Sequence, residues 1–431
     1  MKRNRCTHRH AACLLGLALA APIAANATDG YFSHGYGMKG KGMAGATAAL
    51  AQDAFAGANN PAAGAFAGER LDVGIDWFSP RRKVTRTGSG GGALDFSADS
   101  DSTNFFIPEF GYNSRAQGAL SWGIAVYGNG GMNTDYPGGQ LDCSPFGGPP
   151  SANGLCGMGS LGVDLSQLIV APSIAFKLSP DHAIGIAPLF AYQRFEMNGA
   201  HLFTSLSQSP GDVTNRGYDS STGWGLRVGY QGRVAPGVTI GAAYTTKTRM
   251  GEFDKYKGLF AENGDFDIPE HATVGIAFEP AKGVTVAVDW ERIKYASVAS
   301  VGNPSTNQAP LGSSGGPGFG WQDVDVWKIG VQWQASPALA LRAGYNKSDN
   351  PITSRDVSFN ILAPGVIEDH VTLGFTYALS KDSELTMAYT HAFTNSVEGF
   401  SFFNAFAPGQ GGREKIEMYQ NSIGIAWSRR W

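Results

Sequence analysis

The sequence predicts an all-β protein, a 14-stranded antiparallel transmembrane β-barrel with a small N-terminal plug inside its lumen. Three observations support this prediction. Fourteen runs of residues alternate between apolar and polar side chains with a period of two, the pattern of a strand with two different faces. The connections between these runs are alternately short and long. No segment after the N-terminus has the roughly 18 consecutive apolar residues of a membrane-spanning helix.

The chain begins with a predicted signal peptide, residues 1–27. Basic residues precede an apolar run from Ala11 to Ala24, and small residues follow at Ala25-Asn26-Ala27, where we expect cleavage. This segment carries four basic and no acidic residues, so the remaining 404 residues (431 − 27) have a net charge near −7 (−3 − 4). An acidic mature chain argues against nucleic acid as a partner.

Residues 28–68 are rich in glycine and alanine and contain the triplet Asn60-Pro61-Ala62. A segment of such small residues buries little apolar surface, so it needs an enclosure to stay folded. Proline disfavours the helical region for the residue before it and suits the first position of a helix. We therefore expect Asn60 to be extended and to cap a short helical turn over Pro61–Phe66. The predicted barrel follows, over residues 69–431.

The first strand shows the two faces that the other runs repeat. One face carries Leu71, Val73, Ile75 and Trp77, and the other carries Asp72, Gly74 and Asp76. An arginine that faced lipid near the middle of the membrane would cost about 2–4 kcal/mol, so the basic face must be the lumen. On this argument the basic residues predicted to face the lumen are Arg227, Arg233 and Lys328.

The connections after even-numbered runs have about three to seven residues, and those after odd-numbered runs about twenty to thirty-five. Short turns on one side and long loops on the other are typical of outer-membrane barrels, whose long loops face the outside. A water-soluble β-sandwich also shows alternation. Three features argue against a β-sandwich: the alternation of short and long connections, the signal peptide and the aromatic C-terminus. Since fourteen strands enclose a wide lumen, the N-terminal segment is well placed to block it.

Two features of the predicted external loops stand out. Cys143 and Cys156 are the only cysteines after the signal peptide and share one long loop, which predicts a disulfide in an oxidising compartment. Two other loops carry apolar residues that solubility would not favour, namely Leu202, Phe203 and Leu206 in one and Leu259 and Phe260 in the other. These residues either form a landing groove for a greasy ligand or pack the loops against each other.

The glycine-rich start of the N-terminal segment, its Gly42–Asp53 stretch and Asn60-Pro61-Ala62 together resemble the hatch of the FadL family. This family consists of outer-membrane transporters for long-chain fatty acids and hydrocarbons. The resemblance implies passive uptake of hydrophobic small molecules, with capture at external loops, hatch movement and lateral exit through the barrel wall. In the family the exit lies at a kink in the third strand, for which Gly123 and Gly128 are candidates here.

The resemblance further implies an outer-membrane location in a Gram-negative bacterium and contact with membrane lipid; we also expect a monomer without cofactor. A general or polar-solute porin is the alternative, and a hydrolytic barrel is a third possibility. Gly312–Gly316 fits G-x-S-x-G but lacks the strand-to-helix elbow of a nucleophile. The histidines show no paired ligand spacing, so we expect neither catalytic residues nor a metal site. The sequence leaves fatty acids and hydrocarbons equally open as substrates.

Overall fold

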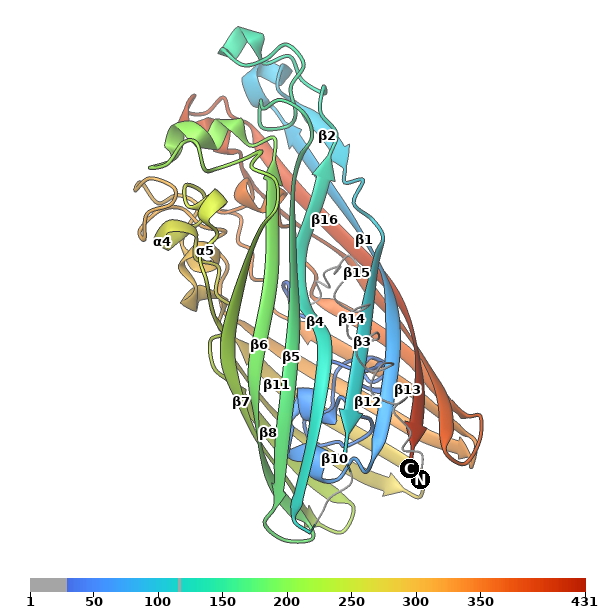
Figure 1. Cartoon of the computed structure of the whole chain (residues 1–431). Helices are drawn as coiled ribbons and strands as arrows, with labels where there is room; N and C mark the ends of the chain where they lie inside the picture. Colours follow the sequence, from blue (N-terminus) through green and yellow to red (C-terminus); the bar gives the residue numbers. More distant parts are fainter. Residues whose placement is uncertain (1–28, 115–117) are drawn as a thin grey trace, which may run out of the picture.

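The computed structural model describes residues 29–114 and 118–431, so the predicted signal peptide lies outside the described residues. Fourteen long strands form a closed antiparallel barrel (Figure 1), which confirms the predicted barrel. Neighbouring strands pair in chain order, and the last strand pairs with the first. The strands are β1 Arg70–Thr87, β3 Phe105–Asn113, β4 Leu120–Tyr136, β5 Leu161–Lys177, β6 His182–Asn198, β7 Asp219–Ala235, β8 Val238–Thr245, β10 His271–Ala281, β11 Val284–Ile293, β12 Val324–Ser336, β13 Leu339–Ser348, β14 Asp369–Ala378, β15 Ser383–Phe400 and β16 Arg413–Arg430.

Two short strands extend this barrel towards its loops. Strand β2 (Phe96–Asp99) pairs with the upper part of β1, and β9 (Arg249–Met250) pairs with β7. Each lies next to a barrel strand in the chain, β2 before β3 and β9 after β8. The barrel strands β3 and β8 are therefore short. After a break in the chain, β2 continues the pairing of β3 with β1, and β9 continues the pairing of β8 with β7.

The faces of the strands alternate as predicted. On β1, Val73, Ile75 and Trp77 point outward with 43%, 43% and 42% of their surface exposed, whereas Asp72 and Asp76 are buried in the lumen. An outward apolar band and an inward polar face suit a wall between lipid and a polar interior. Separately, none of the helices in the described residues is long and apolar enough to cross a membrane.

The connections at the two ends of the barrel differ in length. At one end, here called the turn end, they are two to six residues long, and at the other, the loop end, they are 12 to 30 residues long. Two loops are shorter than the sequence predicts, because the strands beside them are longer than the predicted runs. β1 continues to Thr87 and leaves residues 88–104 before β3, and β15 and β16 leave only residues 401–412 between them. Short helices such as α4 (Ala261–Gly264) and α5 (Ala299–Gly302) lie in the loops.

Residues 29–68 lie inside the barrel towards the turn end (Figure 1). They form helix α2 (Met38–Lys41), helix α3 (Ala56–Asn59) and a 3-10 turn at Pro61–Ala65. Nearly all of their side chains are buried, although few are large. A segment of small residues thus gains its burial from the surrounding wall rather than from a core of its own.

Candidate functional site

Asn60 fixes the middle of the N-terminal segment against the barrel wall. Its backbone is extended, with φ −148° and ψ 111°, and its Oδ1 accepts a hydrogen bond of 3.1 Å from the Ala62 amide, which caps the 3-10 turn as predicted. Its Nδ2 donates to the carbonyl of Ala48 at 2.7 Å and to that of Tyr230 on β7 at 2.9 Å. The side chain is fully buried, so one amide group satisfies three backbone groups.

Two glycines of the wall let the segment approach this closely. A Cβ at Gly229 on β7 would lie 2.0 Å from Asn60 Oδ1, and one at Gly185 on β6 would lie 2.3 Å from the carbonyl carbon of Pro61. Both positions have to be free of side chains for the triplet to reach the wall. The triplet and these glycines therefore form one contact.

Buried ion pairs join the segment to the wall nearer the turn end. Lys39 lies 2.5 Å from Glu384 of β15, and Lys41 lies 2.8 Å from Asp76 of β1 and 3.5 Å from Glu109 of β3. Burying one of these charges without its partner would cost several kcal/mol. The pairs hold helix α2 in a single position relative to three strands.

The barrel wall is interrupted between β3 and β4. These strands pair only from Phe110↔Val126 to Asn113↔Gly123, although β4 continues to Tyr136. Pro108 precedes the ladder on β3 and has no N–H to donate, which is consistent with an unpaired edge. Beyond the ladder, β4 bulges between Gly128 and Gly130 where it pairs with β5.

At this interruption β4 pairs with the N-terminal segment instead. The Ser33 amide donates to the carbonyl of Asn129 at 3.1 Å, and the Gly131 amide donates to the carbonyl of Tyr31 at 3.3 Å. The glycine Gly128 predicted as a kink therefore lies at the bulge, whereas Gly123 lies in the regular part of the ladder. Residues 31–33 thus take the place of β3 along this stretch of β4.

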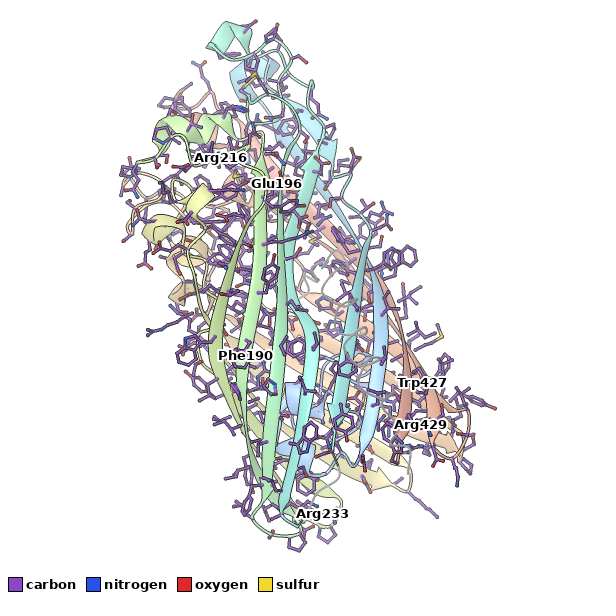
Figure 2. The ribbon with its side chains drawn as sticks, viewed as in Figure 1. Phe190, Glu196, Arg216, Arg233, Trp427 and Arg429 are labelled. Atoms are coloured by element: carbon purple, nitrogen blue, oxygen red, sulfur yellow. A yellow bond between two sulfur atoms is a disulfide. The ribbon has the colours of Figure 1, made fainter. Side chains whose placement is uncertain are left out.

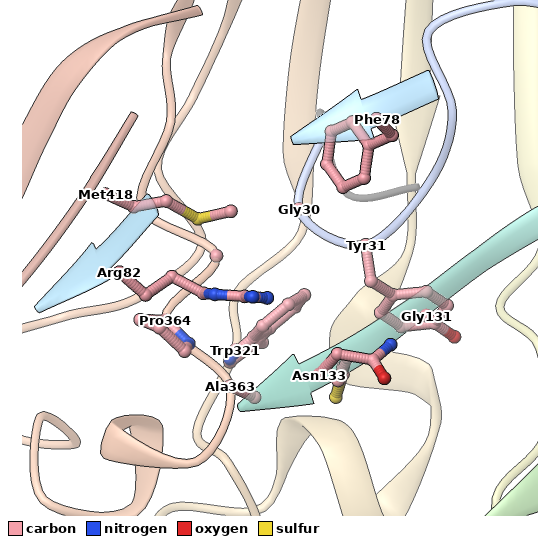
Figure 3. Close-up of a pocket in the computed structure, with 12 residues that line it drawn as sticks. Gly30, Tyr31, Phe78, Arg82, Gly131, Asn133, Trp321, Ala363, Pro364 and Met418 are labelled. Carbon is pink, nitrogen blue, oxygen red and sulfur yellow. The ribbon is translucent and has the colours of Figure 1, made fainter. Parts of the chain in front are cut away.

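An inner pocket lies beside the interruption (Figure 3). Its free volume is about 20 Å³, and most of its lining is apolar. The lining residues include Tyr31 of the N-terminal segment, Phe78 and Arg82 of β1, Met132 and Asn133 of β4, Trp321 and Met418. An outer cavity of about 310 Å³ borders the same interruption and extends over β5 and β6. Its lining includes Ser102, Phe105 and Asn133 and four carboxylates, Asp101, Asp135, Asp164 and Glu196. Asn133 thus borders both spaces.

Of the three basic residues predicted to face the lumen, two are buried there and one is exposed. Arg227 and Lys328 are buried and border one polar interior space of about 40 Å³ next to the N-terminal segment. Lys328 pairs with Glu291 at 2.6 Å, whereas Arg227 bonds to the Thr245 hydroxyl at 2.7 Å. The prediction for Arg233 is wrong, because β7 reaches the turn end there (Figure 2) and 63% of this side chain is exposed beside Asp181.

The apolar loop residues mostly pack the loops together, which corrects three of the predicted capture residues. Phe203 stacks on Phe359 at 4.9 Å, Phe260 contacts Phe195 at 4.7 Å, and both phenylalanines are fully buried, as Leu259 nearly is. Long loops that fold over a lumen bury their largest apolar groups against each other, because the loop end offers no other core. Leu206 is partly buried against the same cluster.

Leu202 instead lines an external groove of about 560 Å³. Phe146, Phe403 and Phe406 also line it, and Phe146 and Phe406 are each 55% exposed. Sequence reasoning missed these aromatic residues, although the FSFFNAF run at 400–406 shows the same signal of apolar residues in a loop. The groove is larger than both the inner pocket and the outer cavity at the wall interruption.

A disulfide borders this groove. It joins Cys143 to Cys156, with Cα atoms 5.7 Å apart, as the sequence predicts. The bridge closes the loop between β4 and β5, and the carbonyl of Gly154 within it accepts from the buried Arg86 guanidinium at 2.7 Å. Separately, no group of three His, Cys, Asp or Glu side chains within residues 29–114 and 118–431 is arranged to hold a metal.

A closed 14-stranded barrel, an interior segment bound to its wall and a long-loop end with an apolar groove define a class, the outer-membrane transport barrels. The comparison with known families agrees. The family model described as "Outer membrane protein transport protein (OMPP1/FadL/TodX)" matches residues 17–405, so the chain belongs to this family. It is accordingly a protein of the outer membrane of Gram-negative bacteria.

Solved structures share the fold at low sequence identity. The Pseudomonas putida toluene transporter TodX is 18% identical with a TM-score of 0.68, over 94% of this chain and 100% of that one. A Pseudomonas aeruginosa FadL homologue is 14% identical with a TM-score of 0.68 (93% and 99% covered). The Ralstonia pickettii toluene transporter TbuX is 19% identical with a TM-score of 0.63 (92% and 99% covered). No curated protein sequence matches the chain.

Proposed function

We propose that the protein takes up hydrophobic small molecules passively across the outer membrane and releases them sideways through its wall. The interruption between β3 and β4 carries this proposal, because there β4 exchanges its wall partner for residues 31–33 of the N-terminal segment. Family membership and the toluene transporters of the same fold support the chemistry of the cargo.

Capture takes place at the external groove lined by Leu202 and the loop phenylalanines. Binding of an apolar molecule to such a surface is favourable by about 25 cal/mol for each Å² of apolar surface that is removed from water. Leu259, Phe260 and Phe203 support the loops that shape the groove rather than touching the cargo. The disulfide at its border keeps the rim in place.

Residues 28–68 act as the hatch. In this role the segment blocks the lumen, and its Tyr31 lines the inner pocket. Its contacts with the wall include the Asn60 hydrogen bonds, the lysine ion pairs and the bonds from the Thr47 and Ala48 amides to Asp289, all outside residues 31–33. A shift of residues 31–33 alone therefore opens the pocket towards β4 while the rest of the segment stays bound.

The cargo leaves between β3 and β4 into the membrane. An apolar molecule passes there once the two backbone bonds between β4 and residues 31–33 are released, and no pair between two wall strands has to break. Phe106, which is 58% exposed on the outer face of β3, offers an apolar surface at this exit. The partners are thus a hydrophobic substrate and outer-membrane lipid, the protein acts as a monomer, and it catalyses no reaction.

Uptake of labelled oleate and of labelled toluene tests this function, in a host that lacks its own transporter and beside an empty vector. Uptake of either one above the vector supports the proposal. A general or polar-solute porin, the alternative, would conduct ions steadily in planar bilayers and take up neither compound. Cleavage of phospholipid or ester by the purified protein would instead indicate a hydrolytic barrel.

A further inference from the structure

The external loop between β11 and β12, residues 294–323, contacts the part of the N-terminal segment that fills the wall interruption. Its Tyr295 is the second residue after β11 and is fully buried. The Tyr295 hydroxyl accepts a hydrogen bond from the Tyr31 amide at 3.2 Å and donates one to the carbonyl of Asp29. One side chain of an external loop thus satisfies two backbone groups of the segment.

Aromatic rings reinforce this contact. The centroid of the Tyr295 ring lies 5.3 Å from that of Tyr31 and 5.7 Å from that of Phe32. Trp321, at the other end of the same loop, lies 5.8 Å from Tyr31 (Figure 3) and 5.1 Å from Tyr295. Its indole donates to Asn360 of the loop between β13 and β14 at 2.6 Å, which fixes the position of the ring. Aromatic pairs at such distances are stabilising beyond the apolar area that they bury.

Tyr31 connects this loop to the wall. Its amide bonds to Tyr295, and its carbonyl accepts from the Gly131 amide of β4 at 3.3 Å. The bond from the Ser33 amide to the carbonyl of Asn129 completes the attachment to β4. Two backbone bonds alone attach a segment weakly, because the net gain from one such bond is small. The contacts with the loop therefore matter for keeping residues 31–33 in the wall.

The wall itself holds the two ends of this stretch. Lys328 of β12 lies 3.7 Å from the Asp29 carboxylate and donates to the carbonyl of His34 at 3.0 Å. Asn346 of β13 donates to the Asp29 carboxylate at 3.3 Å. These partners belong to barrel strands, whereas Tyr295 and the tryptophan of its loop contact the middle of the stretch. A change in the loop therefore acts on the residues that attach to β4.

We propose that Tyr295 is the positioning residue that keeps residues 31–33 on β4, so that the external loop between β11 and β12 controls the exit. This inference rests on the proposed uptake function and adds the residue and the loop that govern release. A molecule that enters the inner pocket has to part Tyr31 from Trp321, because both line it. This separation breaks the bond to Tyr295, and residues 31–33 then leave β4.

Tyr295→Phe removes the hydroxyl and keeps the ring, and Tyr256→Phe is its matched control. Tyr256 is equally buried and belongs to another external loop. Its hydroxyl likewise accepts from one backbone amide, that of Met197 at 3.1 Å, and donates to one carbonyl, that of Gly217 at 2.9 Å. The control therefore removes the same two kinds of bond at a site away from the N-terminal segment.

Hydrogen exchange at the Ser33 and Gly131 amides measures the attachment to β4, because neither bond includes the hydroxyl that is removed. We expect Tyr295→Phe to speed exchange at both about tenfold, since two buried backbone groups of the segment lose their partner. Tyr256→Phe should leave both within about twofold. Adding toluene or oleate should speed exchange in the unaltered protein about threefold or more, and in Tyr295→Phe less than about twofold, because the contact is already lost there.

Folding of each variant is verified by its heat-modifiable migration, and the amides of the ladder between β3 and β4 serve as a reference. Unchanged exchange at Ser33 and Gly131 in folded Tyr295→Phe would overturn the inference. An equal increase in Tyr256→Phe or at the reference amides would also overturn it, as would an equal response of the unaltered protein and Tyr295→Phe to toluene or oleate.

Exchange without cargo does not depend on transport, so the two proposals fail separately. If exchange responds to Tyr295→Phe as expected but the unaltered protein takes up neither oleate nor toluene, the proposed function fails, and the attachment of residues 31–33 through Tyr295 is still supported. If uptake occurs and exchange does not respond, the function stands and the role of Tyr295 is refuted.

Discussion

Replacing Asn60 by alanine tests whether the N-terminal segment closes the lumen. The substitution removes the cap on Ala62 and leaves the carbonyls of Ala48 and Tyr230 without their donor. Loss of a cap costs about 1 kcal/mol, and each buried carbonyl left unpaired costs about 1–3 kcal/mol. The low end of these ranges gives about 3 kcal/mol, which multiplies the undocked fraction of the segment about a hundredfold.

Planar bilayers detect this change as ion conductance. The unaltered protein is expected to be nearly silent, and Asn60→Ala to open about a hundredfold more often. Undocking also frees the part of the segment that stays bound while residues 31–33 move, so the inner pocket is no longer held in one arrangement and oleate uptake slows. Asn60→Asp keeps the capping oxygen but places a buried carboxylate opposite the two carbonyl oxygens, so its conductance is expected to be at least that of Asn60→Ala.

Asn104→Ala is the matched control, because Asn104 is exposed on the outer surface and accepts only from the Trp77 indole at 3.1 Å. It should leave conductance and uptake unchanged. A folded, heat-modifiable Asn60→Ala barrel that stays silent and transports oleate at the unaltered rate would refute the role given to the segment.

Three further predictions follow from buried charges and from the loops. Glu384→Gln leaves the buried Lys39 without an ion pair, whereas Arg70 keeps Asp72, so we expect the barrel to lose about 3–5 kcal/mol of stability in urea unfolding. Replacing Cys143 and its partner by serine should speed protease cleavage within residues 137–160, since the bridge is worth on the order of 3 kcal/mol. Burial and the adjacent Asp267 carboxylate raise the pKa of Asp265, so the loop over residues 246–270 is most stable in acid and loses stability as the pH rises above about 4. Hydrogen exchange at pH 4.5 and 7.5 measures this, and Asp267→Asn should reduce the difference.

The barrel was predictable because each strand carries its own signal. The alternation within β1 alone places Trp77 outside and Asp76 inside, and it does not depend on which strands lie beside β1. The same rule holds for the later strands. The conformation of Asn60 was predictable for a similar reason, since its proline neighbour restricts it locally. Arg233 shows the limit of alternation. The pattern predicts on which face of its strand a residue lies, but it does not predict the position of that residue along the barrel axis.

The site was less predictable because it depends on contacts between distant segments. Phe203 looks like a surface residue in the sequence until Phe359, from another loop, covers it. Arg82 faces the lumen by its period, but its contacts with Ser102 and Phe105 depend on how the chain returns after β1. The interruption beyond Val126 depends on the register of two strands, for which Pro108 was the only local sign.

The junctions between neighbouring strands of this barrel differ in the number of residues that they pair. The junction that closes the barrel, between β1 and β16, contains 18 residue pairs, whereas the junction between β3 and β4 contains four. Backbone pairs are the main resistance of a barrel to lateral tension, because lipid supplies no substitute for them. A stretched membrane would therefore part the wall at β3 and β4 and leave the junction of the chain ends intact. The barrel is therefore easiest to open between β3 and β4 and hardest to open where its first and last strands meet.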